Sequence, residues 1–341
     1  MNAINIFGPK NLQYVTLNPN KIQNGEIRIL MAIAGLCGSD EKLINNHPSK
    51  ITPGHEFSGM VIEVTDSAIN NFSIGDKVTA YPMISCMKCN FCFNLSHRDC
   101  LSKKSLGFQI NGAFAEEIII DHRFVVKLNK DISYEQGALI EHLACGYRLA
   151  KDISIELPDK SARILIIGDG PIGLANIRFL KYFGYNELTL IGKHAKKILL
   201  GKKIGAKFSF FADEIPKINE QQFDICIIAA QANEFLPNIL NTLRDNSLVL
   251  PQTRLTSDSL LSAMHKKKLR IGKAFAYEFN DFYSVMNLIS NNDLSIDNLI
   301  SKIVDLNKFP EFYKSLNKNN YSGKILIRNN NYQKSKENYG L

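Results

Sequence analysis

Residues 161–173 read SARILIIGDGPIG, an apolar run followed at once by three closely spaced glycines. The apolar run predicts a buried strand, and Gly168, Gly170 and Gly173 then match the pattern G-x-G-x-x-G. The pattern follows a strand and opens a helical segment at 174–183, so it predicts a turn that binds a dinucleotide. The alternative is a strand-to-helix turn that needs glycine for its backbone alone.

Strands and helices are expected to alternate beyond this turn. Buried strands are predicted at 188–191 and 223–230, with a helix at 196–204 between them. Strands that alternate with helices and are apolar throughout indicate a parallel α/β sheet. The first half of the chain differs, because its short apolar stretches are separated by turn signals and indicate a β-rich barrel or sandwich. These stretches are 26–34, 59–64, 75–78 and 113–120.

Two domains are therefore expected, as the length of 341 residues also suggests. We assign residues 1–145 to the β-rich domain, with a cysteine lobe at about 86–100. Residues 146–275 form the dinucleotide-binding domain, and 276–341 return to the first domain. The Asn- and Lys-rich stretch 329–341 has little to bury and is expected to fray.

Composition narrows the class of protein. The chain is 45% hydrophobic, and no apolar run approaches the roughly 18 residues of a membrane span, so a soluble protein without a membrane partner is expected. The net charge is +8, but the lysines are scattered without aromatic–basic alternation, so no nucleic-acid partner is expected. Met1 to Lys10 lacks the apolar core of an export signal, and the seven cysteines form an odd set, so a reducing cytoplasm is predicted.

Four cysteines, Cys86, Cys89, Cys92 and Cys100, are spaced as two overlapping C-x2-C steps and a nearby fourth thiol. Such a loop can surround one metal ion tetrahedrally, and Zn²⁺ held by four thiolates keeps no open position for water or substrate. The spacing therefore predicts a structural zinc lobe. Two disulfides in an exported protein are the alternative, and an iron–sulfur cluster usually spaces its fourth cysteine differently.

A second set of possible ligands lies upstream of the lobe. Cys37 belongs to the run Cys37-Gly38-Ser39-Asp40, and His55 and Glu56 follow about eighteen residues later. A cysteine, a histidine and a carboxylate can hold a second zinc with room for an alcohol oxygen. Taken alone, a cysteine and a histidine this far apart are more often unrelated.

Together these motifs resemble those of the zinc-dependent medium-chain dehydrogenases of the alcohol dehydrogenase superfamily, most closely their polyol (sorbitol) and threonine dehydrogenase branches. The motifs, in order, are Cys37-Gly38-Ser39-Asp40, Gly54-His55-Glu56, the cysteine lobe, Gly112-Ala113-Phe114-Ala115-Glu116, the glycine turn and Gly323-Lys324-Ile325. The resemblance implies a GroES-like catalytic domain, a Rossmann domain with a doubly wound parallel sheet, two zinc ions per subunit, and a homodimer or homotetramer.

The resemblance also implies roles for single residues. Cys37 and His55 would bind the catalytic zinc, and Glu56 would bind it or lie beside it. Glu141 matches a further carboxylate ligand of the family. Asp40 would orient His55, as carboxylates commonly do for a zinc-bound imidazole.

Proton transfer is expected to begin at Ser39, which would take the proton of the alcohol. The family often has a relay histidine where this chain has Lys42, so the proton could leave through Lys42, water or ribose hydroxyls. His142 replaces a proline that often follows the family's glutamate, and it could face the site or serve the structure.

The choice of cofactor should depend on the end of the second strand, which reads Leu190-Ile191-Gly192-Lys193-His194. NAD sites usually place an acid there, and none is present at this strand end. Gly192 would make room, and Lys193 and Lys197 could pair with a 2′-phosphate, unless they only solvate a helix face. The sequence thus predicts NADP(H) over NAD(H). The predicted cofactor-binding residues are Gly168, Gly170, Pro171, Ile172, Gly173, Gly192, Lys193 and Lys197.

The expected reaction is hydride transfer between a nicotinamide and a secondary alcohol or its ketone, with zinc as the Lewis acid. The expected substrate is a polyol, a cyclitol or a sugar phosphate, and threonine is the main amino-acid alternative. A dinucleotide-binding redox sensor or scaffold without turnover is the alternative from another class.

Overall fold

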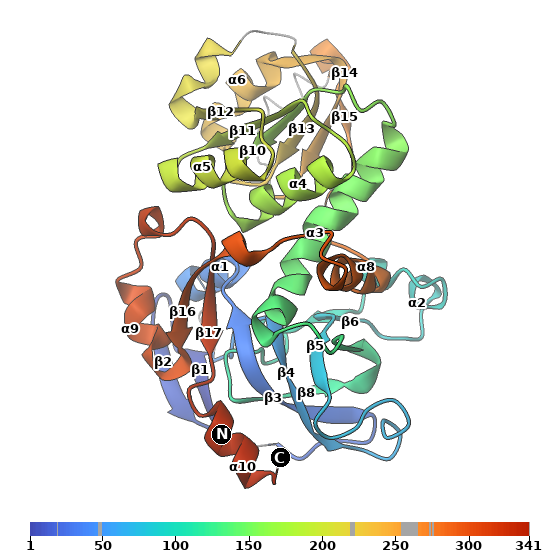
Figure 1. Ribbon diagram of the computed structural model, residues 1–341, viewed down its shortest axis with the longest axis vertical. Helices are drawn as coiled ribbons and strands as arrows, with labels where there is room; N and C mark the ends of the chain where they lie inside the picture. Colours follow the sequence, from blue (N-terminus) through green and yellow to red (C-terminus); the bar gives the residue numbers. More distant parts are fainter. Residues whose placement is uncertain are drawn as a thin grey trace. The chain divides into compact units, whose positions relative to one another are not determined.

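The computed structural model describes residues 1–18, 20–46, 50–218, 222–253, 265–272, 274 and 276–340. These residues divide into two units (Figure 1). Unit 1 comprises Met1–Glu141, Glu278–Asn317 and Lys324–Leu341, and unit 2 comprises His142–Tyr277 and Lys318–Gly323. Within the described residues, no helix has both the length and the apolar character needed to cross a bilayer.

Unit 1 is built on a seven-stranded sheet in which β3 (Glu26–Gly35) is the hub. Nine of its ten residues are buried, and it pairs antiparallel with three other strands. The path of the sheet is β16 (Ile300–Asp305), β17 (Lys324–Arg328), β3, β4 (Glu56–Val64), β5 (Lys77–Ala80) and β9 (Val125–Lys127), with β8 (Glu117–Asp121) paired to β3. Two short hairpins accompany it, β1 (Asn2–Ile6) with β2 (Leu12–Thr16) and β6 (Met83–Ile84) with β7 (Lys104–Ser105).

Helices of unit 1 pack against this sheet or connect its strands. They are α1 (Gly38–Asn46), α2 (Asn90–Phe93), α8 (Phe279–Ser290), α9 (Phe309–Lys314) and α10 (Tyr332–Asn338), while α3 (Tyr134–Glu156) runs from unit 1 into unit 2. Helix α8 is held by aromatic contacts, because its Phe279 and Phe282 meet Tyr81 edge-on at centroid distances of 5.6 and 5.9 Å. Such aromatic pairs fix a helix in position as well as burying it.

The expectation that residues 329–341 fray is wrong for the described part, which ends at residue 340. Helix α10 forms there, and Tyr332 packs against a cluster of Leu30, Met60 and Ile62. The Tyr332 hydroxyl donates to the Tyr134 hydroxyl at 2.8 Å. Tyr332 thus provides an apolar contact, which the Asn- and Lys-rich composition of this stretch does not suggest.

Unit 2 contains a six-stranded, wholly parallel sheet. Its order is β12 (Phe208–Phe211), β11 (Leu188–Gly192), β10 (Ile164–Ile167), β13 (Phe223–Ile228), β14 (Leu243–Pro251) and β15 (Arg270–Ile271). From β10 the chain adds β11 and β12 on one side of the sheet. It then adds β13, β14 and β15 on the other side, so the direction of strand addition reverses at β10. This is the doubly wound order of the Rossmann fold, and it confirms the predicted α/β class.

Helices cover both faces of the parallel sheet. On one face, α6 (Leu236–Asn241) packs against side chains such as Leu165 and Cys226. On the other, α5 (Ala195–Ile204) approaches β11 so closely that a Cβ at Gly201 would lie 2.3 Å from Leu190 Cδ2. Burial on both faces explains why these strands are apolar throughout rather than alternating.

The glycine turn joins β10 to α4 (Pro171–Tyr182). Gly168 has φ +119°, in the region that favours glycine, and a Cβ at Gly173 would lie 1.9 Å from the Gly168 carbonyl oxygen. A Cβ at Gly170 would meet no heavy atom within 4 Å. The first and third glycines therefore serve the turn itself, while the second leaves open space beside the helix N-terminus.

This difference predicts effects of different size for two alanine substitutions. Gly173→Ala forces a methyl group onto a backbone oxygen and should lower the free energy of unfolding by about 1–3 kcal/mol. Gly170→Ala should cost less than about 1 kcal/mol, because it only weakens a helix cap. Urea denaturation of both variants checks this, and equal destabilisation by the two would contradict the packing described here.

Candidate active site

The four lobe cysteines converge in unit 1. Cys86 follows β6, Cys89 caps α2, Cys92 lies on α2 and Cys100 follows a short 3-10 turn. Their sulfurs all lie within 4.8 Å of one another. All seven cysteines are unbridged, and the Cys89 and Cys92 sulfurs are 3.5 Å apart, far beyond a disulfide bond. The structure thus assembles a four-sulfur cage and forms neither disulfide of the alternative interpretation.

Protonation of these sulfurs is uneven. Burial opposes ionisation of Cys92, but hydrogen bonds from Ser85, Cys89 and Cys100 outweigh it and lower the pKa of Cys92 to about 5. The backbone N–H of Cys92 favours the thiolate of Cys89, yet burial and the neighbouring sulfurs raise the pKa of Cys89 to about 11. Four sulfurs this close cannot all be ionised without a cation, and a divalent metal ion is the group that suits them.

A second donor set forms where β3 ends and β4 begins. Gly35 and Glu56 are paired across the two strands, which brings the loop carrying Cys37 beside His55 and Glu56. The ligand atoms of Cys37, His55 and Glu56 lie within 4.8 Å of one another. Strand pairing therefore joins residues that the sequence alone leaves about eighteen positions apart.

Asp40 organises this donor set from α1, and it is fully buried. One carboxylate oxygen accepts from the Cys37 backbone N–H at 2.9 Å, and the other accepts from the Gly54 N–H at 3.2 Å. The second oxygen also lies 3.2 Å from His55 Nδ1. Since Nδ1 faces Asp40, Nε2 is the ring nitrogen left to bind a metal. Burial lowers the pKa of His55, but Asp40 outweighs it and raises that pKa well above its usual value.

Lys324 is the residue that sequence reasoning missed. Its Nζ lies 2.6 Å from Glu56 Oε1, and the two side chains are 1% and 0% exposed. Burial opposes its charge, but the negative groups of Glu56, Cys37 and Glu141 raise the pKa of Lys324. The run Gly323-Lys324-Ile325 was visible in the sequence, but only the pairing of β17 with β3 shows what the lysine faces.

The other oxygen of Glu56 is available to a cation. Glu56 Oε2 is buried and has no hydrogen-bond partner among the described residues. A Cβ at Gly35 would lie 2.4 Å from this oxygen, so the glycine on the neighbouring strand makes room for it. A buried, unpartnered carboxylate oxygen is costly, and a metal ion would satisfy it.

The remaining predicted residues are not among the three clustered donors. Glu141 is 7% exposed on α3, and its carboxylate is not among the three clustered donors, although its charge acts on Lys324. His142 follows it and is also buried. Ser39 is half-buried and Lys42 is exposed, both on α1. Their roles stay predictions.

The glycine turn provides the features of an anion site in unit 2. Gly170 is the N-cap of α4 and Pro171 is its first residue, so Ile172 and Gly173 lie in the first turn. Backbone N–H groups in a first helical turn have no partner within the helix and attract negative charge. The structure therefore brings together the turn residues predicted to hold a pyrophosphate.

The end of β11 differs from the prediction. Asp169, from the glycine turn, places its carboxylate there and accepts hydrogen bonds from the backbone of Lys193 and His194. Lys193 Nζ lies 5.3 Å from the centroid of the Phe235 ring, and Lys197 is only 8% exposed. The strand itself has no acid, as the sequence shows, but a carboxylate from the glycine turn occupies its end. The preference for NADP(H) stays a prediction.

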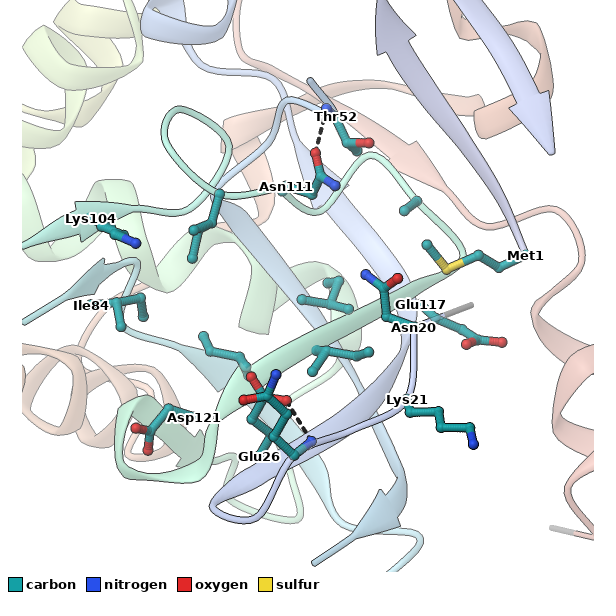
Figure 2. Close-up of a pocket in the computed structure, with 17 residues that line it drawn as sticks. Met1, Asn20, Lys21, Glu26, Thr52, Ile84, Lys104, Asn111, Glu117 and Asp121 are labelled. Carbon is teal, nitrogen blue, oxygen red and sulfur yellow. Dashed lines mark hydrogen bonds between the residues drawn. The ribbon is translucent and has the colours of Figure 1, made fainter. Parts of the chain in front are cut away.

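A hollow of about 680 Å³ elsewhere in unit 1 is lined by none of the predicted site residues (Figure 2). Its wall carries both signs of charge, including Lys21, Glu26, Lys104 and Asp121. Two residues of its wall are joined by a hydrogen bond, which the Thr52 N–H donates to Asn111 Oδ1 at 3.2 Å. The metal donors therefore do not open into this cavity.

Comparison with known proteins finds similar proteins over most of the chain. Residues 23–130 match the alcohol dehydrogenase GroES-like domain. Galactitol 1-phosphate 5-dehydrogenase of Escherichia coli K12 is 28% identical over 325 residues, covering 89% of this chain and 92% of that protein. The predicted resemblance to the zinc-dependent medium-chain dehydrogenases is thereby confirmed, as is the predicted enzyme class, the alcohol and polyol dehydrogenases that use zinc and a nicotinamide cofactor.

Two further comparisons extend over most of the chain. D-arabitol-phosphate dehydrogenase of Enterococcus avium is 26% identical over 341 residues, covering 95% of each protein. A zinc-binding dehydrogenase of Sinorhizobium meliloti 1021, solved bound to NADP, has a TM-score of 0.83 at 21% identity and covers 96% of this chain and 99% of that one. At this identity the solved structure shows the shared fold.

The buried pair of Glu56 and Lys324 predicts a large effect on stability. Lys324→Met should lower the free energy of unfolding by about 3–5 kcal/mol, because it leaves a buried carboxylate unpaired. The double variant with Glu56→Gln should recover part of that loss. Urea denaturation of the metal-free protein measures both.

Lys207→Met is the matched control, since Lys207 and Glu187 are also 2.6 Å apart but are 48% and 33% exposed. Breaking that exposed pair should cost at most about 1 kcal/mol. Equal losses of unfolding free energy in Lys324→Met and Lys207→Met would contradict a large effect of the buried pair on stability.

Proposed function

We propose that this enzyme oxidises a secondary alcohol of a polyol or polyol phosphate, or reduces the matching ketone, with a nicotinamide dinucleotide as hydride carrier. The observation that carries the proposal is the donor set of Cys37, His55 and Glu56, which includes a buried and unpartnered carboxylate oxygen. Mixed sulfur, nitrogen and oxygen donors of this kind suit a zinc ion that keeps a position for substrate.

In this proposal Cys37 and His55 hold the catalytic zinc, and Glu56 or Glu141 supplies the carboxylate. Bound there, zinc supplies a Lewis acid that lowers the pKa of the substrate alcohol. The four lobe sulfurs hold a second, structural zinc, because a four-thiolate set leaves no open position.

The surrounding residues of the chain prepare the reactive centre. Asp40 fixes the ring of His55 and so presents Nε2. Lys324 offsets the negative charge of Glu56, so the donors do not fully neutralise a divalent cation. Residual positive charge at that point favours an alkoxide over the alcohol.

Proton transfer is assigned to α1. Ser39 is half-buried and takes the proton of the alcohol, while Lys42 is exposed and passes it to solvent. The two residues are three positions apart, which places them on one side of the helix. The glycine turn of unit 2 would hold the pyrophosphate, with Gly170 close to it, and so position the nicotinamide for hydride transfer.

The substrate class is proposed from the relatives and from charge. Both curated relatives described above are named for phosphorylated sugar alcohols. A net charge of +8 is also compatible with an anionic substrate.

Cys37→Ala tests the reactive centre. The variant should lose turnover by about a thousandfold, or about 4 kcal/mol of transition-state stabilisation, because a zinc ligand is removed. The dissociation constant of the reduced cofactor, measured by its fluorescence, should change by less than about threefold, because the dinucleotide turn belongs to the other unit.

Cys89→Ser serves as the comparison, because it removes a sulfur from the structural lobe instead. It should lower the thermal unfolding temperature while leaving the donor set at Cys37 intact. Full activity in Cys37→Ala would show that the reactive centre is assigned to the wrong residues.

A panel of alcohols tests the substrate class. Initial rates with both oxidised cofactors should give the highest kcat/KM for sugar alcohols or their phosphates, ahead of cyclitols and threonine. A clear preference for threonine would contradict the proposal. Cofactor binding without turnover of any alcohol would favour the redox sensor instead.

A further inference from the structure

An acidic side chain occupies the end of the second strand of unit 2 although the strand itself supplies none. Asp169 is the first variable residue of the glycine turn, two positions beyond β10. Strands β10 and β11 are paired with Ile167 opposite Ile191, so the turn lies beside the end of β11. Asp169 is 6% exposed.

Hydrogen bonds hold the carboxylate of Asp169 in place. Its Oδ2 accepts from the backbone N–H of Lys193 at 2.8 Å and of His194 at 2.7 Å. His194 Nδ1 lies 3.0 Å from each carboxylate oxygen. His194 is also the N-cap of α5, so the carboxylate stands at the start of that helix, where negative charge is stabilised.

Gly192 is fitted to this carboxylate. A Cβ at Gly192 would lie 2.6 Å from Asp169 Oδ2 and 2.7 Å from Asp169 Cβ. The space that the glycine provides is therefore filled by Asp169 and is not open to a phosphate group.

We propose that Asp169 makes the dinucleotide site prefer NAD(H) over NADP(H). The inference rests on the proposed function, in which unit 2 binds a nicotinamide dinucleotide. In Rossmann domains an acid at the end of the second strand accepts a hydrogen bond from the adenosine ribose 2′-hydroxyl. Asp169 reaches that place from the glycine turn.

The carboxylate has capacity for that contact. A carboxylate offers about four lone-pair positions, and two backbone donors occupy Oδ2. Within the described part of the chain, Oδ1 of Asp169 has His194 Nδ1 as its neighbour and receives no backbone N–H. A ribose hydroxyl can donate to Oδ1, whereas a 2′-phosphate at the same place would face a fixed negative charge at short range.

The lysines predicted to attract a 2′-phosphate do not offset this repulsion. Lys193 is directed over Phe235, with its Nζ 5.3 Å from the ring centroid. Lys197 is 8% exposed on α5. The acid is fixed by hydrogen bonds beside the ribose position, while one lysine lies over an aromatic ring and the other is buried.

Fluorescence titration of the zinc-loaded enzyme with NADH and with NADPH tests the proposal without relying on turnover. The wild type should bind NADH at least about tenfold more tightly than NADPH. Asp169→Asn keeps an acceptor for the backbone N–H groups but removes the charge. The ratio of the NADPH dissociation constant to the NADH dissociation constant should therefore fall to about three or less. Gly192→Ala should also lower the ratio, because its methyl group displaces the carboxylate.

Asp245→Asn is the matched control, because Asp245 is an exposed acid of unit 2 near the start of β14. It should leave the ratio unchanged. Equal or tighter binding of NADPH by the wild type, or an unchanged ratio in Asp169→Asn, would overturn the role of Asp169 while leaving the dinucleotide site standing. Binding of neither nucleotide would overturn the proposed function, and this inference with it.

Discussion

The buried contact between Lys324 and Glu56 is the interaction on which the proposed reactive centre depends. It joins residues 268 positions apart in the sequence, at the start of β17 and the start of β4, on either side of β3. A buried ion pair contributes little net stability compared with apolar residues of the same volume. Its value here is to hold a fully buried carboxylate in place, with one oxygen paired to the ammonium group and the other without a hydrogen-bond partner among the described residues. The last strand of unit 1 thus helps to assemble a centre whose other residues lie in its first sixty.

Both proposed sites place a carboxylate with the help of a glycine on the adjacent strand or at its end. Gly35 leaves room for Glu56 in unit 1, and Gly192 leaves room for Asp169 in unit 2. A side chain at either glycine would displace the oxygen that the site uses. The two proposed metal sites differ in their donors. Four sulfurs would enclose a structural metal ion completely, whereas the mixed set at Cys37 would leave a position for substrate.

Features that depend on local patterns could be predicted from the sequence. The apolar run before Gly168, the glycine spacing and the spacing of the lobe cysteines each reflect one strand, turn or loop, and the α/β class followed from them. Features that depend on strand pairing could not. Lys324 looked like an ordinary residue until β17 was placed beside β3, and Asp169 looked like a variable position until the turn was placed beside β11. The packing of Tyr332 corrected the expected fraying for the same reason, because its partners are distant in sequence.

The central claim is that Cys37, His55 and a glutamate, Glu56 or Glu141, hold a zinc ion distinct from one in the cysteine lobe. Anomalous diffraction from crystals of the enzyme, recorded on both sides of the zinc absorption edge, locates each zinc directly. This account predicts two peaks per chain, one among the four lobe sulfurs and one between Cys37 and His55 with a glutamate oxygen beside it. A single peak in the lobe, from protein purified with zinc present throughout, would contradict it.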